Sequence, residues 1–157
     1  RVRWLSGVTV SGGEPTNVPG LGMILHEISA FGLPLKLDTN AMRPDVVEAL
    51  LAEGLVELFS VDLKGPFDQY PALTGGAVSE HDARKNLSRI FALAEARPEA
   101  FAFRTTVVPQ LSEADITTVR GLLPGGFTLA TQDYHPPRRP HALTDSEARR
   151  TAGNLVQ

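Results

Sequence analysis

Short apolar runs alternate with helical patterns along the whole chain. Five runs, rich in β-branched or aromatic residues, predict strands. These strands are expected at residues 7–10, 34–37, 56–63, 101–108 and 127–130. Between them, apolar residues recur at helical spacing and predict helices over residues 21–31, 44–53, 80–97 and 112–123.

Several helix ends are marked by residues with capping chemistry. Pro44 suits the first turn of its helix, and Gly54 follows the last apolar residue of the same pattern. Ser112 with Asp115 predicts a capping box, and Thr144 with Glu147 predicts a second one that opens a last, weakly apolar helix. Residues 64–79 are expected to form a long loop, and residues 135–140 an irregular crossing segment.

Strand and helix in strict alternation predict βα units and a parallel sheet. Crossovers between parallel strands are right-handed almost without exception, so the strands should all curl the same way. Five units are too few for a closed eight-stranded barrel. The α/β sheet is therefore either a partial (βα) TIM-like barrel or an open doubly wound sheet, in one domain over residues 1–157.

The composition fits a globular domain and narrows its class. The chain has 157 residues, 42% hydrophobic and 21% charged, with a formal net charge of -3. Nucleic-acid binders usually show a basic stripe, so this weakly acidic balance argues against one. No apolar run reaches the length needed to cross a bilayer and no signal peptide is visible, so we expect no membrane partner and a cytoplasmic location.

Cysteine is absent from the sequence. This excludes disulfides, cysteine nucleophiles, zinc–thiolate sites and cluster ligands supplied by these residues. The first residue is Arg1, and an apolar strand pattern follows almost at once. We therefore expect the chain to be N-terminally incomplete, with a first βα unit missing.

Candidate chemistry follows the predicted strands. Polar groups occur at four of the five strand ends, at Ser11–Glu14, Asp38–Asn40, Asp62–Lys64 and Gln132–His135. In parallel α/β folds the carboxyl ends of the strands form the reactive edge of the sheet. Arg104 lies within the fourth strand, where a polar side chain has to be paired or functional.

The glycines of the first strand end, Gly12 and Gly13, allow positive φ and leave room for a ligand on main-chain atoms. The alternative is a tight turn that places Glu14 near a helix start. The segment contains neither a Walker lysine nor the third glycine of a dinucleotide-binding loop.

Asp38 and Asp62 should lie roughly 5 Å apart if consecutive strands pair, because that is the spacing of neighbouring strands. Two such carboxylates repel, so a proton or a bridging cation is expected between them. Lys64 lies on the same strand face as Asp62 and would neutralise the pair or bind an anionic ligand group. The alternative for Asp38 and Asn40 is that they only cap a turn.

Each of the remaining candidate ligand-binding residues also has a purely structural interpretation. Arg104 would clamp a carboxylate in a bidentate manner, or form an ion pair with an aspartate of a neighbouring strand. His135 would contact a ligand or simply be solvated. The segment Leu73–Gly76 would cradle an anion or form a plain glycine turn.

Five strings occur together in one order and spacing. They are Val-Thr-Val-Ser-Gly-Gly-Glu-Pro-Thr, Leu-Asp-Thr-Asn, Val-Asp-Leu-Lys-Gly-Pro, Tyr70 with the following Leu-Thr-Gly, and Phe-Arg-Thr-Thr-Val-Val-Pro. The set resembles the radical SAM activating enzymes of glycyl-radical proteins, most of all the anaerobic ribonucleoside-triphosphate reductase activating type, with the pyruvate formate-lyase activating type as near kin. The resemblance covers about residues 7–109.

This resemblance implies a partial (βα)6 barrel and a site for S-adenosylmethionine. The loop Ser11, Gly12, Gly13 and Glu14 would receive the methionine amino group of the cofactor. Asp38 and Lys64 would also contact the cofactor, Arg104 would lie near its carboxylate, and His135 would match a late histidine of the family.

The resemblance also implies a monovalent cation beside the cofactor. Asp38, Thr39 and Asp62 match the positions that would surround it, and Ser60 would offer only its backbone carbonyl. The implied partners are a glycyl-radical enzyme, of the anaerobic ribonucleotide reductase type, and an electron donor such as flavodoxin.

The main departure from the family is the missing cluster motif. The family holds a [4Fe–4S] cluster on a CxxxCxxC loop, and its chemistry cleaves S-adenosylmethionine to a 5′-deoxyadenosyl radical that abstracts a glycine hydrogen from the partner. Because this chain has no cysteine, we expect it to be inactive by itself. Two other functions stay open, a degenerate barrel that serves as a scaffold or interaction module, and a lysine-dependent aldolase-like enzyme that uses Lys64.

Overall fold

Five parallel strands form one sheet in the order of the sequence, β1-β2-β3-β4-β5, in a computed structural model that describes residues 5–136. The strands are β1 (Val8–Val10), β2 (Leu35–Thr39), β3 (Leu58–Asp62), β4 (Phe101–Val107) and β5 (Leu129–Asp133). The α-helices are α1 (Leu21–Ser29), α2 (Pro44–Glu53), α3 (Tyr70–Leu73), α4 (Glu80–Ala96) and α5 (Glu113–Leu122). Three short 3₁₀ helices complete the fold, η1 (Pro15–Asn17), η2 (Phe67–Gln69) and η3 (Pro98–Ala100).

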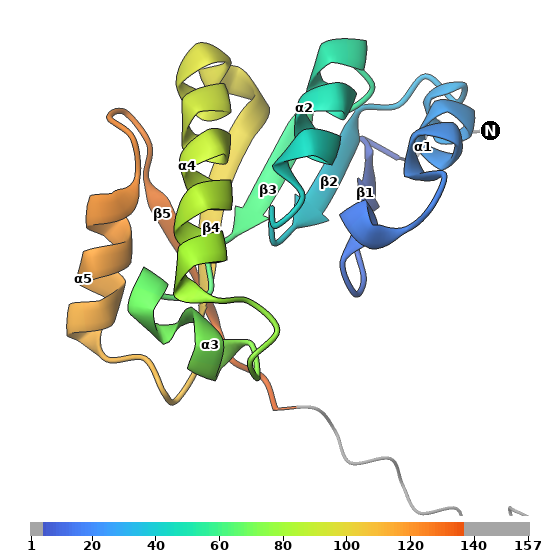
Figure 1. Cartoon of the computed structure of the whole chain (residues 1–157). Coiled ribbons are helices and arrows are strands. Elements are labelled where there is room, and N and C mark those ends of the chain that lie inside the picture. Colours follow the sequence, from blue (N-terminus) through green and yellow to red (C-terminus); the bar gives the residue numbers. More distant parts are fainter. Residues whose placement is uncertain (1–4, 137–157) are drawn as a thin grey trace, which may run out of the picture.

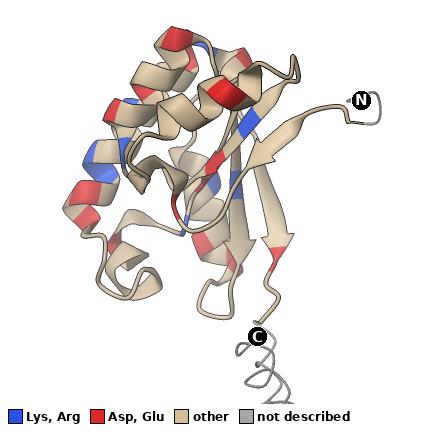
Figure 2. Cartoon of the chain, turned by 90° about the vertical axis from the view of Figure 1, so that its right-hand side faces the viewer, with Lys and Arg blue, Asp and Glu red and all other residues tan. Residues whose placement is uncertain are grey.

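The strand order decides between the two predicted architectures. A doubly wound sheet reverses its strand order at a switch point, whereas this order runs straight through. Right-handed crossovers then place the helices on the same side of the sheet. Figures 1 and 2 show the helices on one face of the sheet and the other face open. The α/β prediction and its partial-barrel form are confirmed.

Core and polar residues alternate along each central strand. In β2, Leu35 and Leu37 are buried beneath the helices, while Lys36 and Asp38 lie on the open face. The same alternation holds in β4, where buried phenylalanines flank the exposed Ala102. These two strands therefore contribute to the hydrophobic core on one side and to a polar surface on the other. Figure 2 shows both signs of charge on the strand ribbons.

Aromatic packing joins the sheet to the helices. The Phe103 side chain is 2% exposed, and its ring centroid lies 5.5 Å from that of Phe91 on α4 and 5.1 Å from that of Phe127. Phe59 of β3 stacks on Phe101 of β4 with centroids 5.3 Å apart. These contacts place the densest part of the core over β3 and β4.

Two elements differ from the sequence prediction. The fifth strand begins at Leu129 and extends to Asp133, because its backbone pairs with β4 from Phe103 to Val107. Phe127, which the apolar pattern placed inside the strand, packs edge-on against Phe103 instead. The predicted loop after β3 contains η2 and α3, which begins next to Pro71.

Three smaller predictions about turns are also answered. The capping box of Ser112 and Asp115 is present at the start of α5. The segment Leu73–Gly76 closes α3 as a glycine turn, with the Gly76 N–H donating to the Pro71 carbonyl at 2.7 Å. The predicted helix at Thr144, and most of the predicted crossing segment, lie outside the described residues. Among residues 5–136, no helix has the length and apolarity that a membrane crossing requires.

Replacing the buried Thr105 by valine should raise the free energy of unfolding by about 1 kcal/mol, because a buried hydroxyl without a partner is costly. Thr105 is 0% exposed, and its Oγ1 has no hydrogen-bond partner within the described part of the chain. Thr39 offers the matched control, because it is 3% exposed but its hydroxyl is hydrogen-bonded. Thr39→Val should lower the free energy by about 1–3 kcal/mol. Urea unfolding measures both, and equal losses in the two variants would contradict the assignment.

Candidate functional site

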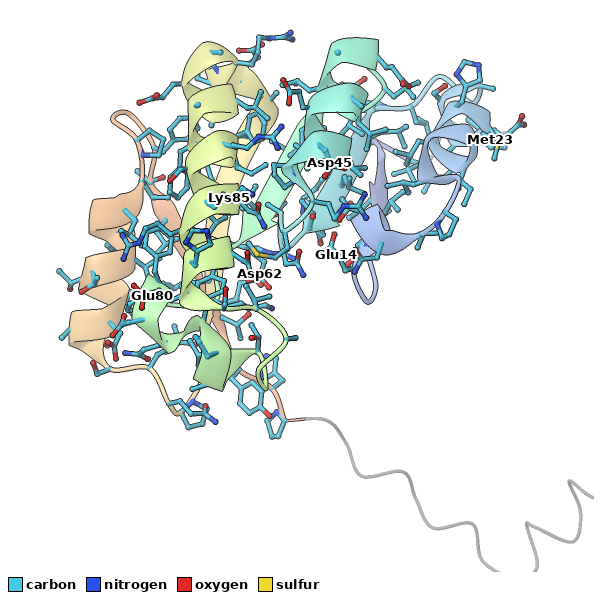
Figure 3. The ribbon with its side chains drawn as sticks, in the orientation of Figure 1. Glu14, Met23, Asp45, Asp62, Glu80 and Lys85 are labelled. Carbon is cyan, nitrogen blue, oxygen red and sulfur yellow. The ribbon has the colours of Figure 1, made fainter. Side chains whose placement is uncertain are left out.

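A polar pocket lies at the carboxyl ends of the strands. It is lined by Ser11, Gly12, Gly13, Glu14, Asp38, Thr39, Asn40, Asp62, Lys64 and Arg104. Figure 3 shows Glu14 and Asp62 at this edge, with Met23 far from it on α1. The pocket therefore gathers residues from the ends of β1, β2 and β3 and from β4.

The glycine loop after β1 presents its main chain to this pocket. Gly12 and Gly13 have φ angles of 111° and 53°, in the region that favours glycine. A Cβ added at either position would meet nothing within 4 Å. The backbone conformation, and not crowding, is therefore what these glycines supply, and the space beside them is free for a ligand.

Glu14 connects the glycine loop to the end of β2. Its Oε1 accepts hydrogen bonds from the backbone N–H of Thr16 at 3.1 Å, from the Thr16 hydroxyl at 2.5 Å and from the Thr39 hydroxyl at 2.7 Å. Its Oε2 accepts the Asn40 N–H at 2.7 Å. Glu14 is thus the N-cap of η1, as the turn interpretation predicted, and Oε2 keeps acceptor capacity.

The turn after β2 is held in an unusual conformation. Ala41 has a φ of 59° and is completely buried, although a left-handed conformation costs about 1–2 kcal/mol outside glycine. Its N–H donates to the Thr39 hydroxyl at 2.9 Å. The Asn40 side chain accepts the Met42 N–H at 3.0 Å, which is the turn role that the sequence offered as its alternative. These bonds stabilise the turn that carries Asn40 toward Glu14.

Asp38 has a cation at each carboxylate oxygen. Lys36 Nζ lies 3.0 Å from Oδ1, and Arg104 Nη2 lies 3.1 Å from Oδ2. Burial by itself raises the pKa of Asp38, but the Lys36 contact and the Arg104 charge outweigh it and hold the pKa below its ordinary value. Asp38 is paired in register with Ser60. The expectation that Asp38 faces Asp62 across neighbouring strands was therefore wrong by two residues.

Asp62 forms its own ion pair with Lys64. The Lys64 Nζ lies 2.6 Å from Asp62 Oδ2, and the Lys64 backbone N–H donates to the Tyr70 hydroxyl at 3.1 Å. Tyr70 is 1% exposed, and burial raises its pKa to about 12. The phenol therefore stays protonated and fixes the start of the loop that carries Lys64.

Arg104 extends across the open face of the sheet. It is paired in register with Asp62 of β3, yet its ion pair is with Asp38 of β2, one strand further on. Ser60 and Ala102 are the small residues in register with Asp38 on this face, which leaves space for the guanidinium. Its Nε is buried and has no hydrogen-bond partner among the described residues.

The structure separates one candidate from the others. His135 follows β5, is exposed, and is not among the residues that line the pocket. Conversely, sequence reasoning missed the contacts of Lys36 and Tyr70. Lys36 precedes Asp38 by two residues, so strand periodicity was a usable signal, whereas nothing in the sequence placed the Tyr70 hydroxyl at Lys64.

Comparison with known proteins gives the family. The family model for the radical SAM superfamily matches residues 1–123. A protein of Methanocaldococcus jannaschii whose name is that of a glycyl-radical enzyme activating enzyme is 28% identical over 131 residues. The match covers 82% of this chain and 55% of the relative, so the chain spans about half the length of the curated relative it matches.

Two solved structures have a similar fold. A domain of the pyruvate-formate lyase-activating enzyme from Bacteroides vulgatus superposes with a TM-score of 0.61 at 22% identity, covering 96% of this chain and 93% of that one. TYW1, solved with a lysine-pyruvate adduct bound, gives a TM-score of 0.63 at 19% identity, covering 96% and 49%. At these identities the likeness shows the fold, and the family model covers most of the sequence. The chain belongs to the radical SAM superfamily.

Proposed function

We propose that this chain is the S-adenosylmethionine-binding portion of a radical SAM enzyme that activates a glycyl-radical partner. Membership of the superfamily and the name of the Methanocaldococcus jannaschii relative support the proposal. The observation that carries it is the single pocket in which a glycine loop, carboxylates and cations from four strands meet. Such a set suits a ligand that carries an ammonium and a carboxylate on one carbon.

The charged groups of the pocket match the methionine end of the cofactor. Glu14 Oε2 accepts one hydrogen bond from the protein, so it would accept a further one from the methionine ammonium. Arg104 uses Nη2 on Asp38, and its buried Nε lacks a partner in the part of the chain that the structure describes. A ligand carboxylate would satisfy such a donor, and planar guanidinium groups suit carboxylates.

The cluster ligands have to come from outside these residues. The sequence contains no cysteine, so no thiolate of this chain is able to hold a [4Fe–4S] cluster. When bound, the cluster of a radical SAM enzyme supplies the electron that cleaves the sulfonium. The residues present here would bind and orient the cofactor, and the proposal therefore includes that the chain alone does not cleave it.

Finer assignments belong to the same proposal. A glycyl-radical enzyme is the partner class that the relative's name implies, and an anaerobic ribonucleotide reductase is the candidate within that class. Flavodoxin as electron donor and a cytoplasmic location are further parts of it. Because the chain covers 55% of the relative, all statements about the whole enzyme are proposals.

The alternative aldolase function is less well supported. A Schiff-base lysine is activated by a hydrophobic pocket or by a second cation nearby, whereas the Lys64 Nζ forms an ion pair with a carboxylate, Asp62 Oδ2, at 2.6 Å. The lysine adduct in the TYW1 structure is a property of that protein. A scaffold function would leave the polar pocket without a ligand, and the binding experiment below separates it from the proposed one.

Titration calorimetry with S-adenosylmethionine tests the proposal. Wild type should bind, and Lys64→Ala should weaken binding by about tenfold, since a charge-assisted contact contributes roughly 1.5–3 kcal/mol. Lys85→Ala is the matched control, because Lys85 is an exposed lysine on α4 and is not among the residues that line the pocket. Absence of binding by wild type would favour a scaffold, and equal affinity of Lys64→Ala and wild type would remove Lys64 from the site.

The expected inactivity has its own measurement. Wild-type chain is incubated with S-adenosylmethionine and dithionite, and 5′-deoxyadenosine is quantified by chromatography. No product above the protein-free background is expected, since the sequence has no thiolate ligand. Product formation would show that this part of the proposal is wrong.

A further inference from the structure

Tyr70 and the following Leu-Thr-Gly form a motif to which the proposed function assigns no role. The motif forms α3 and the glycine turn after it, at the end of the loop that leaves β3. Neither Tyr70 nor the segment Leu73–Gly76 is among the residues that line the ligand pocket. Any effect of the motif on a ligand therefore passes through another residue. Tyr70 is hydrogen-bonded to one that does line the pocket, Lys64.

The backbone at Lys64 is held by a side chain and not by a strand. The preceding residue, Leu63, continues the pairing of β3 with β4, because its N–H donates to the Arg104 carbonyl at 2.8 Å. The next N–H along the chain, that of Lys64, donates to the Tyr70 hydroxyl at 3.1 Å. Tyr70 is 1% exposed, so water competes little for its hydroxyl. The course of the chain at Lys64 therefore depends on one buried hydroxyl group.

The residue after Lys64 packs against the same motif. A Cβ added to Gly65 would lie 2.5 Å from Leu73 Cδ1 and 3.1 Å from Leu111 Cδ2, so a larger residue would displace these side chains. The Pro66 carbonyl then accepts the Gln69 N–H at 3.0 Å and begins the turn into η2. The leucine of the motif thus packs on the loop directly beside the position that its tyrosine holds.

The remaining residues of the motif hold Tyr70 in place. The Thr74 N–H and the Thr74 hydroxyl both donate to the Tyr70 carbonyl, at 2.9 Å and 2.6 Å. The Thr74 hydroxyl also accepts the Val78 N–H at 3.1 Å. Gly75 and Gly76 have φ angles of 62° and 83°, which lets the chain turn back directly after α3. The whole motif therefore supports the tyrosine or the loop that the tyrosine contacts.

A fixed backbone matters at Lys64 because its side chain is long and flexible. The Lys64 Nζ lies 2.6 Å from Asp62 Oδ2, and the lysine side chain is 41% exposed. Holding such a side chain in one conformation costs entropy. A group that is already held in its binding position loses less freedom when the ligand arrives, and the ligand binds more tightly as a result.

We infer that Tyr70 is a positioning residue, whose buried hydroxyl holds the backbone of Lys64 so that the lysine ammonium lies beside Asp62 in the ligand pocket. Tyr70 acts on the ligand through Lys64 and makes no contact with the ligand itself. The inference rests on the proposed S-adenosylmethionine site for the ligand. The hydrogen bond between Tyr70 and Lys64, in contrast, belongs to the protein without ligand.

A double-mutant cycle tests this dependence on Lys64. Tyr70→Phe removes the hydroxyl and keeps the ring. Calorimetry gives the affinity for S-adenosylmethionine of wild type, Tyr70→Phe, Lys64→Ala and the double variant. In the protein without ligand, nuclear magnetic resonance follows hydrogen exchange of the Lys64 N–H relative to that of Val61 in β3, which corrects for changes in overall stability. Ile90→Val is the control, because Ile90 is 0% exposed on α4 and does not line the pocket.

Tyr70→Phe should weaken binding of S-adenosylmethionine by about fivefold in the presence of Lys64. In the Lys64→Ala background the same substitution should change the affinity by less than about twofold. The Lys64 N–H should exchange about tenfold faster in Tyr70→Phe than in wild type, because its acceptor is lost. Ile90→Val should lower the thermal unfolding midpoint by about 2–4 °C, and it should change neither the affinity nor the relative exchange rate.

Three outcomes would overturn the inference. The first is an equal loss of affinity from Tyr70→Phe with and without Lys64. The second is an unchanged affinity of Tyr70→Phe when Lys64→Ala binds more weakly than wild type. The third is an unchanged relative exchange rate of the Lys64 N–H. If wild type binds no S-adenosylmethionine at all, the proposed function fails, and the exchange rate still decides whether the Tyr70 hydroxyl holds the Lys64 backbone.

Discussion

Glu14→Ala is expected to lower the free energy of unfolding by about 3 kcal/mol, because each hydrogen bond to a charged group contributes roughly 1.5–3 kcal/mol and the losses are not additive. The Glu14 carboxylate accepts bonds from Thr16, Thr39 and Asn40. Alanine leaves these donors without an acceptor, and the glycine loop loses its connection to the end of β2. Affinity for S-adenosylmethionine should fall by about a hundredfold or more, since both a ligand contact and the loop geometry are lost.

Two variants make this result interpretable. Glu27 is an exposed glutamate on α1, and Glu27→Ala should change the free energy of unfolding by less than about 0.5 kcal/mol. Glu14→Gln preserves the shape of the side chain but removes its charge and places an amide N–H₂ among hydrogen-bond donors, so it should fall between wild type and alanine. Urea unfolding and calorimetry give both quantities. If Glu14→Ala unfolds like Glu27→Ala, the four bonds to the carboxylate do not stabilise the loop.

Phe103→Ala should have the largest effect on stability, a loss of about 3–5 kcal/mol in the free energy of unfolding. The Phe103 ring is 2% exposed and packs between Phe91 and Phe127. Its removal leaves a cavity between β4 and the helices that the surrounding side chains fill only in part. Because whole domains of this size are stabilised by about 5–15 kcal/mol, one such cavity removes a large fraction of the total.

The control for this variant is an aromatic residue outside the core. Phe31, which follows α1, is 65% exposed, and Phe31→Ala should cost less than about 0.5 kcal/mol. Urea unfolding followed by circular dichroism measures both variants. A similar loss in the two would mean that the packing at β4 does not dominate the stability. Phe103 directly precedes Arg104 in β4, so ligand affinity should fall together with stability.

Local patterns were enough to predict most of the fold. Strand and helix alternation gave the parallel sheet, and the capping residues gave the start of α5 correctly at Ser112. The choice between the two sheet architectures could not be made, because strand order depends on long-range pairing. The fifth strand was misplaced for the same reason. Its bounds follow its pairing with β4, and its own apolar run is only a partial guide.

The site was predictable to the extent that strand ends converge. Glu14, Asp38, Asp62 and Arg104 line one pocket, which is what parallel strands of one sheet require. The partners of these groups were less predictable. Which carboxylate Arg104 reaches depends on the register of three strands, and register is not encoded by any one segment.

Other contacts depend on backbone conformation. The left-handed φ of Ala41 could not be predicted from the sequence, because alanine rarely adopts this conformation. That conformation accompanies the bond from the Ala41 N–H to the Thr39 hydroxyl. Without this bond, the Thr39 hydroxyl could be interpreted as free to bind a cation, which is the role that the family resemblance implied.

The alternation of buried and polar residues along β2 decides both which side chains enter the core and which side chains face the pocket. Asp38 faces the open side of the sheet and Thr39 the helices, so inserting or deleting one residue before them would exchange the two sides. A leucine would then face the pocket and a charged side chain would face the helices. Changes in chain length during evolution should therefore accumulate between the strands, while the strands themselves keep their length.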